Sequence, residues 1–218
     1  MFAATGAIRG QDIARISSDD VVSSMSKTDF LISLGGCYAT YPRIDFPDAL
    51  EELRELPCSL LILDGESDDH DLLADHPAYP WNGGLAQLLS RGVMRLCRGQ
   101  VFDLGGISVL TMGGASTEGR EDIGKYWNWW PEQDPSREDV LAALENASGK
   151  HLDYVLTCDC PSSWKPLVGR GNCPSSDALE DLRKEVDYDC WLFSHNGPDR
   201  EFPEQRARCI DMDVVPLR

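Results

Sequence analysis

The sequence lacks the features that would place this protein in a membrane or on a nucleic acid. No hydrophobic run approaches the roughly 20 residues of a membrane-spanning helix, and the opening MFAATGAIRGQDIARIS has no basic segment followed by an apolar one, as a signal peptide has. Positive charge is scarce and scattered, with 20 Lys and Arg against 37 Asp and Glu. The formal net charge of -17 repels phosphate backbones and anionic membrane surfaces. We therefore expect a cytoplasmic protein that binds neither nucleic acid nor membranes.

Internal repeats, low-complexity tracts and obvious linkers are also absent. A chain of 218 residues, 42% hydrophobic and 26% charged, suits one globular unit, and we expect a single domain over residues 1–218. The 8 cysteines could suggest a disulfide framework, but several lie in apolar, strand-like runs such as PCSLLILDG and CWLFSH. In a chain without a secretion signal such cysteines are more typical of reduced core thiols.

Short hydrophobic runs that end in turn residues recur along the chain. Uninterrupted apolar runs of this length are typical of strands buried on both faces, as in α/β proteins. Closely spaced runs at 93–96, 100–104 and 107–112 instead predict an antiparallel meander. Helical spacing of apolar residues, with Ser136 as one N-cap, predicts three helices. The predicted strands outside the meander are 2–5, 30–34, 59–63, 153–157 and 190–193, and the predicted helices are 47–56, 136–148 and 176–186.

The segments at the strand ends are the place to look for a site, because ligands of open α/β sheets gather at the carboxyl ends of strands. These segments are TGAIRG, LGGCY, LDGESDDH, TMGGAS, LTCDCPSS and FSHNGPD. In this order and spacing, the set resembles the calcineurin-like metallophosphoesterases, in particular the small bacterial members. The resemblance covers nearly the whole chain and is strongest in DGESDDHDLL, WNGG, RGQVFDLGGISVLTMGGAS, WWPEQDPS and LDYVLTCDCPSS. It implies an α/β sandwich of two packed, mixed β-sheets flanked by helices.

The chain departs from that family at the metal-ligand positions. In the family two divalent metals share a bridging Asp, activate a water and hold the phosphate oxygens. The corresponding positions of this chain, which we regard as vestigial, are Ala7, Arg9, Gly36, Glu66, Ser67, Cys158, His195 and Gly197. The first metal would lose every ligand, and Ser67 replaces the His credited with protonating the leaving group. The resemblance therefore implies a pseudoenzyme with no cofactor, which acts by binding a small anion or a protein partner.

Two alternatives remain open. Glu66, Cys158 and His195 are competent zinc ligands. If they converge, one zinc ion with an open position could lower the pKa of its water to about 7 and make the protein a mononuclear phosphoesterase. The other alternative is a structural subunit with a vestigial pocket. The sequence does not indicate an oligomeric state.

Arg9 is a candidate for anion binding. It brings a fixed positive charge to a position where the family has a metal ligand, and its planar guanidinium suits phosphate or carboxylate. The backbone N–H groups of Gly35 and Gly36 could assist it. An equally supported interpretation is that Arg9 pairs with one of the many local acids, such as Glu66, Asp68 or Asp69.

Two further segments carry an interpretation. Trp127, Trp129 and Trp130 form an aromatic cluster that could stack on a ligand ring or face a partner, although large aromatics more often serve as packing. The acidic run at 66–71 lacks the spacing of a Ca²⁺-binding loop and predicts a solvated helix start.

Overall fold

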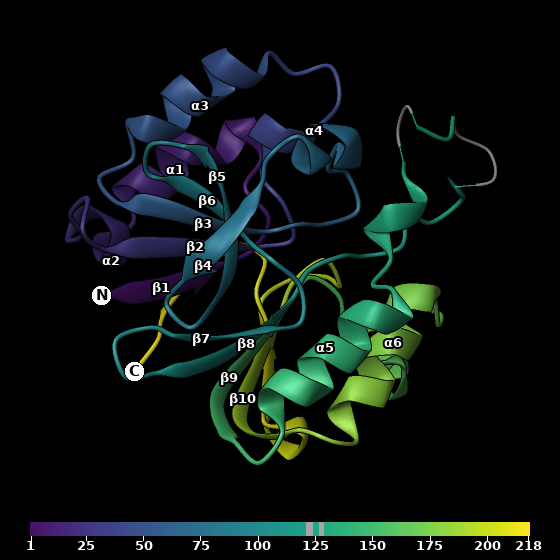
Figure 1. The fold of residues 1–218 in the computed structure, drawn as a ribbon. Helices are drawn as coiled ribbons and strands as arrows, with labels where there is room; N and C mark the ends of the chain where they lie inside the picture. Colours follow the sequence, from purple (N-terminus) through teal and green to yellow (C-terminus); the bar gives the residue numbers. More distant parts are fainter. Residues whose placement is uncertain (121–123, 127–128) are drawn as a thin grey trace.

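Two β-sheets packed face to face form the centre of the molecule, and helices cover the outer face of each (Figure 1). The computed structural model describes residues 1–120, 124–126 and 129–218. These residues form a seven-stranded sheet in the order β13-β1-β2-β3-β6-β5-β4 and a six-stranded sheet in the order β11-β12-β10-β9-β8-β7. Each sheet mixes parallel and antiparallel pairs. The chain is thus an α/β sandwich of two mixed sheets, the architecture expected from the sequence.

The elements have the following bounds. The first sheet contains β1 (Phe2–Thr5), β2 (Phe30–Leu34), β3 (Ser59–Leu63), β4 (Ala78–Trp81), β5 (Gly84–Ser90), β6 (Val93–Leu96) and β13 (Val214–Pro216). The second contains β7 (Gln100–Asp103), β8 (Ser108–Met112), β9 (His151–Thr157), β10 (Asp187–Phe193), β11 (Arg200–Phe202) and β12 (Ala207–Cys209). The α-helices are α1 (Ile13–Ser18), α2 (Asp20–Ser23), α3 (Phe46–Arg54), α4 (His70–Ala74), α5 (Arg137–Ala147) and α6 (Pro174–Arg183). Short 3₁₀ helices are η1 (Gly10–Asp12), η2 (Tyr38–Thr40), η4 (Pro131–Gln133), η5 (Ser162–Val168) and η6 (Pro203–Gln205).

The central strands are buried on both faces, which explains their uninterrupted hydrophobic sequences. Successive side chains of a strand point to opposite faces of its sheet. In β3, Leu60 and Ile62 join the core under the N-terminal helices, whereas Leu61 and Leu63 join the core between the two sheets. In the second sheet, Trp191 of β10 packs in the core beneath α5 and α6, and its neighbour Leu192 faces the first sheet. Three cores therefore separate four layers.

Most of the predicted elements are present, but the meander is wrong in one respect. β7 and β8 do form an antiparallel hairpin, as predicted. β6, however, pairs with β3 and β5 in the first sheet, and the chain then crosses to the second sheet before β7 begins. The predicted helix at 136–148 is confirmed as α5, where Ser136 and Asp139 form a reciprocal capping box.

The structure also bears on the predictions about the cysteines and about membrane-spanning helices. All 8 cysteines are free thiols, in agreement with the expectation of reduced cysteines. Within the described ranges, no helix is long and apolar enough to cross a bilayer.

Candidate functional site

The carboxyl ends of β2 and β3 meet those of β8, β9 and β10 where the two sheets adjoin. The hydroxyl of Ser194, just after β10, donates to the carbonyl of Leu34 at the end of β2. A Cβ added to Gly35 would stand 2.7 Å from Cys158 Sγ and 2.8 Å from Ser194 Oγ. Gly35 therefore lets the end of β2 approach β9 and β10 more closely than any residue with a side chain would allow. The strand-end segments singled out in the sequence do come together.

Three of the predicted site residues share one cavity. Glu66, Ser67 and His195 line a cavity of about 600 Å³ at the strand ends. His195 Nδ1 lies 3.5 Å from Glu66 Oε1, and both side chains are partly exposed. His195 also has a positive φ of 65°, which is uncommon for a residue other than glycine and recurs where a loop must present a side chain.

Cys158 lies behind this cavity rather than in it. Its side chain is buried, with 1% of its surface exposed, and its sulfur packs against Gly35. Burial, followed by the nearby charge of Asp159, raises the pKa of the Cys158 thiol well above its ordinary value. Burial therefore favours the neutral thiol, and ligation of a metal by Cys158 would require this thiol to lose its proton.

The donor set does not fit a metal. Among the described residues, no group of three or more His, Cys, Asp or Glu side chains is arranged to hold a metal ion. Glu66 and His195 face each other, whereas the third predicted ligand, Cys158, is a buried thiol that does not line the cavity.

Arg9 and its expected helpers do not form an anion site. Arg9 is exposed and its guanidinium lies 3.7 Å from the carboxylate of Asp211, which was not among the acids named for it. The backbone N–H groups of Gly35 and Gly36 both donate to the carbonyl of Leu63, at 3.2 and 2.5 Å. Because these donors are already used, the predicted assistance to Arg9 is wrong. Ala7 and Gly197 likewise contribute nothing to the walls of the 600 Å³ cavity within the described part of the chain.

Asp68 fills the space beside Gly36, with its carboxylate where a side chain at position 36 would lie. Its side chain is 1% exposed. Thr40 Oγ1 donates to one carboxylate oxygen, and the Gly65 N–H donates to the other at 2.5 Å. Burial raises the pKa of Asp68 to about 6, and the charge of Asp64 adds to the rise, while the hydrogen bond from Thr40 opposes it. The sequence predicted that the acidic run at 66–71 is solvated. Asp68 departs from this prediction, because its side chain is buried.

Asp64 anchors the same strand end through two arginines. Its carboxylate is fully buried. Arg95 donates to Oδ1 from Nε and Nη2 at 3.0 and 2.8 Å, and Arg98 donates to Oδ2 from Nε at 2.9 Å and from Nη2. Burial alone would raise the pKa of Asp64, but the two guanidinium groups outweigh it and hold the pKa far below its usual value. The group is structural, since every carboxylate lone pair has a donor.

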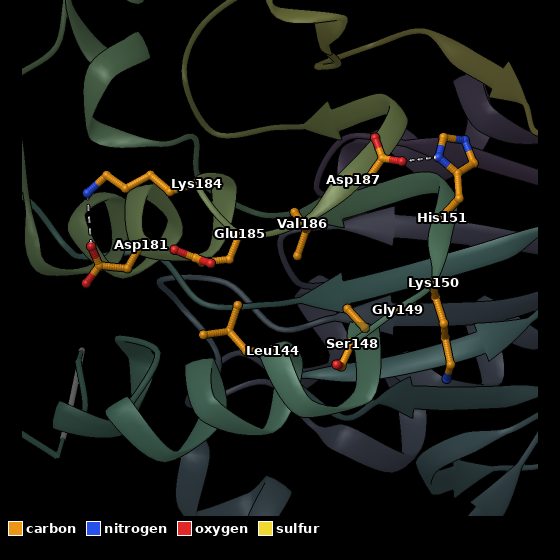
Figure 2. A pocket seen from close by; sticks show the side chains of 11 residues that line it. Leu144, Ser148, Gly149, Lys150, His151, Asp181, Lys184, Glu185, Val186 and Asp187 are labelled. Atoms are coloured by element: carbon orange, nitrogen blue, oxygen red, sulfur yellow. Dashed lines mark hydrogen bonds and ion pairs between the residues drawn. The ribbon is translucent and has the colours of Figure 1, made fainter.

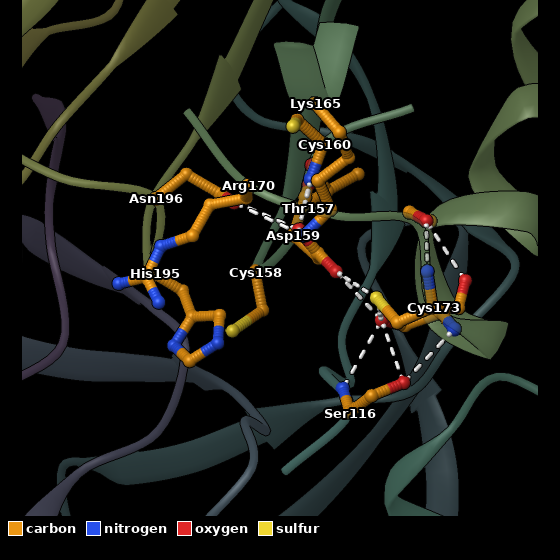
Figure 3. Close-up of polar contacts among 12 residues, drawn as sticks. Ser116, Thr157, Cys158, Asp159, Cys160, Lys165, Arg170, Cys173, His195 and Asn196 are labelled. Carbon is orange, nitrogen blue, oxygen red and sulfur yellow. Dashed lines mark hydrogen bonds and ion pairs between the residues drawn. The ribbon is translucent and has the colours of Figure 1, made fainter. Parts of the chain in front are cut away.

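A second cavity adjoins the first and widens it into a cleft. This cavity of about 330 Å³ shares Thr117, Glu118, Arg170 and His195 with the first. Its other walls are formed by Ser116, Gly119, Arg120, Lys165, Asn196 and the segment 171–174. We call the two cavities together the strand-end cleft. Arg170 and His195 lie at its centre and are drawn together in Figure 3.

A buried network holds this part of the cleft in place (Figure 3). Lys165 Nζ lies 2.6 Å from Asp159 Oδ1 and donates to Asn196 Oδ1 at 3.1 Å. The Asn196 amide donates in turn to Asp159 Oδ1 at 2.8 Å and to the Ser194 carbonyl at 2.9 Å. Burial acts to raise the pKa of Asp159, but Lys165 together with the hydrogen bonds from Ser175 and Asn196 outweighs it, and the pKa is lowered. Because Asn196 ties Ser194 to Asp159, the network fixes the turn that presents His195.

The cations of the cleft differ in how firmly they are held. Lys165 is 5% exposed and Arg120 33%, and their partners Asp159 and Asp134 are largely buried. Arg170 Nη1 pairs with Glu118 Oε1 at 2.9 Å, with side chains 44% and 72% exposed. Arg170 is therefore the cation of the cleft that can exchange its partner most readily. No strand-end motif marked it, because it follows η5 rather than a strand.

A larger cavity, of about 820 Å³, lies elsewhere, between α5 and α6 (Figure 2). It adjoins the amino-terminal ends of β9 and β10, where His151 Nδ1 lies 2.7 Å from Asp187 Oδ2 and His151 Nε2 3.0 Å from Asp189 Oδ1. Hydrogen bonds to these carboxylates raise the pKa of His151. This larger cavity is lined by no residue that the sequence analysis singled out as a candidate, and its lining mixes Lys, Asp and Glu. We therefore place the candidate site at the strand-end cleft.

Of the three tryptophans singled out in the sequence, the structure describes Trp129 and Trp130. Trp127 lies outside the described residues. Trp130 is buried, and its indole N–H donates to Asp71 Oδ2 at 3.0 Å, so it serves as packing. The guanidinium of Arg120 lies 5.3 Å from the centre of the Trp129 ring.

Comparison with known proteins adds little to these observations. No family model matches the chain, and no curated protein matches it. Among solved structures, the chain is similar to the crystal structure of phosphopantetheinyl hydrolase from Mycobacterium tuberculosis, with 14% identity and a TM-score of 0.43 over 95% of this chain and 88% of that one. A similarity this weak carries no argument about function.

Proposed function

We propose that this chain is a degenerate calcineurin-like metallophosphoesterase that binds a small anion at Arg170 and His195 and has lost two-metal hydrolysis. The observation that carries the proposal is the strand-end cleft, whose two cavities share Arg170 and His195. Arg170 supplies a permanent positive charge with several N–H donors, which match phosphate or carboxylate oxygens. His195 adds a ring nitrogen within the same cleft.

The loss of two-metal hydrolysis is supported by what fills the strand ends. Asp68 stands against Gly36, Cys158 stands against Gly35, and both side chains are buried. Two metals would need ligands at Ala7, Arg9, Gly36 and Gly197, of which none carries a carboxylate or an imidazole. The mononuclear alternative would need Cys158 to bind as a thiolate, against the burial that raises its pKa.

The electrostatic argument for an anion rests on partner exchange at Arg170. Exposed ion pairs such as Arg170–Glu118 stabilise a fold by only about 0–1 kcal/mol. A bidentate anion that displaces Glu118 would therefore lose little and gain charge-assisted hydrogen bonds. The net charge of -17 on the whole chain disfavours non-specific binding of anions. An anion that binds here does so through the local geometry.

Isothermal titration calorimetry with phenylphosphonate, a phosphate-like anion that cannot be hydrolysed, tests the proposal. The protein is first treated with a chelator and exchanged into metal-free buffer. We expect saturable binding by the wild type and a loss of about tenfold or more in Arg170→Ala, as for removal of a charge-assisted hydrogen-bond donor.

Arg91→Ala is the matched control. Arg91 is exposed and lies in the turn between β5 and β6, at the opposite end of β6 from the cleft. Its replacement removes one positive charge, as Arg170→Ala does, and should leave the affinity unchanged. Equal weakening in both variants would show only a general charge effect, and no binding by the wild type would refute the proposal.

A further inference from the structure

The walls of the 600 Å³ cavity are divided between two kinds of surface. Arg170 and His195 lie on one part, together with Glu66, Ser67, Thr117 and Glu118. The apolar part comes from one segment, residues 41–44, which follows η2 and supplies Tyr41, Pro42 and Ile44. One cavity therefore presents a cation and an apolar surface to the same occupant.

The apolar wall is held firmly in place. Tyr41 is half-buried and packs against the core beneath the N-terminal helices. Its backbone N–H donates to the carbonyl of Tyr38 at 3.1 Å, and its carbonyl accepts from Ile44 at 3.4 Å. Between them Arg43 has a positive φ of 66°, which a bulky residue adopts only where the surrounding structure enforces it. The segment is thus a fixed turn that turns Ile44, 43% exposed, outward.

We infer that the ligand is an organic anion with an apolar ring, whose charged group lies at Arg170 and whose ring packs on Tyr41, Pro42 and Ile44. This inference rests on the proposed function, because it presumes that an anion binds at Arg170. A phosphate or carboxylate alone would fill a small fraction of 600 Å³ and would leave the apolar wall in water. Binding sites of this kind fix orientation through a few polar groups and gain most affinity from apolar contact. An organic anion with a ring removes both its ring and this apolar wall from water, whereas an anion without a ring does not. This difference in buried apolar area should make the organic anion bind more tightly.

The test compares three probes by calorimetry: inorganic phosphate, phenylphosphonate and benzyl alcohol. We expect phenylphosphonate to bind at least about tenfold more tightly than inorganic phosphate, since burying a ring and its wall removes substantial apolar area from water. Benzyl alcohol has the ring without the charge and should bind more weakly than phenylphosphonate.

Ile44→Ser separates the apolar wall from the cation. Ile44 is 43% exposed and lies outside the buried cores, so its replacement should leave the fold intact. The variant should reduce the advantage of phenylphosphonate over phosphate several-fold and leave phosphate binding unchanged. Leu141→Ser, which changes another exposed apolar residue, in α5 and outside the cleft, should alter neither affinity.

The outcomes separate the two proposals. If phosphate and phenylphosphonate bind equally and both are weakened by Arg170→Ala, anion binding stands and the apolar subsite is refuted. If Ile44→Ser and Leu141→Ser have the same effect, the subsite is likewise refuted. If neither anion binds, the proposed function itself fails.

Discussion

The carboxylate of Asp68 lies directly against Gly36: a Cβ added to Gly36 would stand 2.6 Å from Asp68 Oδ2. Contacts this short are not tolerated, so a side chain at position 36 and the present position of Asp68 exclude each other. The carboxylate comes from the turn after β3 and fills the space that a side chain at position 36 would need.

Gly36→Ala should therefore destabilise the protein more than its backbone conformation alone requires. A positive φ costs alanine about 1–2 kcal/mol, and overpacking against Asp68 adds about 1–3 kcal/mol. Gly106→Ala is the matched control, because Gly106 also has a positive φ, of 94°, and nothing lies within 4 Å of its added Cβ. Urea denaturation measures both.

The Asp68 contact can be isolated by a double-mutant cycle. Asp68→Ala in the Gly36→Ala background removes the clash, so the combined loss should be smaller than the sum of the single losses. Strict additivity would contradict the account, as would equal losses in Gly36→Ala and Gly106→Ala.

Asp68 should also make stability depend on pH between about 4 and 6. Its pKa is raised from 3.8 to about 6 in the folded protein. The native state therefore binds a proton that the unfolded chain releases, and stability is lost as the pH rises through this window. A shift of this size corresponds to at most about 3 kcal/mol.

Asp68→Asn should remove this dependence and leave the fold intact. The Thr40 hydroxyl has one hydrogen but contacts both the Cys37 carbonyl, at 2.7 Å, and Asp68. An amide at position 68 can donate to Thr40, which then donates to Cys37, while its oxygen accepts from Gly65. Chemical denaturation at a series of pH values should show a flatter profile in the variant. A profile identical to wild type would mean that Asp68 is ionised throughout.

Asp64→Asn should be strongly destabilising, because it removes the buried carboxylate that binds both Arg95 and Arg98 and leaves only the longer 3.6 Å pair of Arg98 with Asp139. Removing one partner of a buried ion pair costs about 3–5 kcal/mol. Asp213→Asn provides the control, since Asp213 pairs with Arg208 at the surface and is 51% exposed. Its loss should cost no more than about 1 kcal/mol. Similar losses in both variants, measured by urea denaturation, would contradict the structural role of Asp64.

Glu118→Gln should tighten anion binding several-fold, because Glu118 competes with the ligand for Arg170. The side chain is 72% exposed, so the substitution should not disturb the fold. Calorimetry with phenylphosphonate at rising salt should show the gain shrink as charges are screened. Glu138→Gln, an exposed acid in the first turn of α5, changes the net charge equally and should give no gain. Unchanged affinity in Glu118→Gln would argue against partner exchange at Arg170.

The central strands and the main helices could be predicted from the sequence because local signals define them. β1, β2 and β3 are uninterrupted hydrophobic runs, and Ser136 is a helix cap with its partner three residues on. Strand partners are not encoded locally. For this reason the close spacing of the two runs in the sequence predicts one meander that contains both β6 and β7, although the two strands lie in different sheets.

The site could be predicted only in part, for a similar reason. The rule that ligand sites lie at the carboxyl ends of strands predicted correctly that Glu66 and His195 lie in one cavity. It could not find Arg170 or Lys165, since both belong to the region around η5 and reach the cleft only through tertiary packing. Nor could it show that Asp68, within an acidic run, is buried by Thr40 and the turn after β3.

The claim that this fold has replaced a two-metal centre with a binding cleft is tested most directly by metal content. The protein is purified without chelator or metal-binding tag, incubated with zinc, manganese and iron, desalted and measured by elemental mass spectrometry. The account predicts no near-stoichiometric metal. One or two metals per chain, lost in Cys158→Ser or His195→Ala, would contradict it and restore a metal-dependent phosphoesterase.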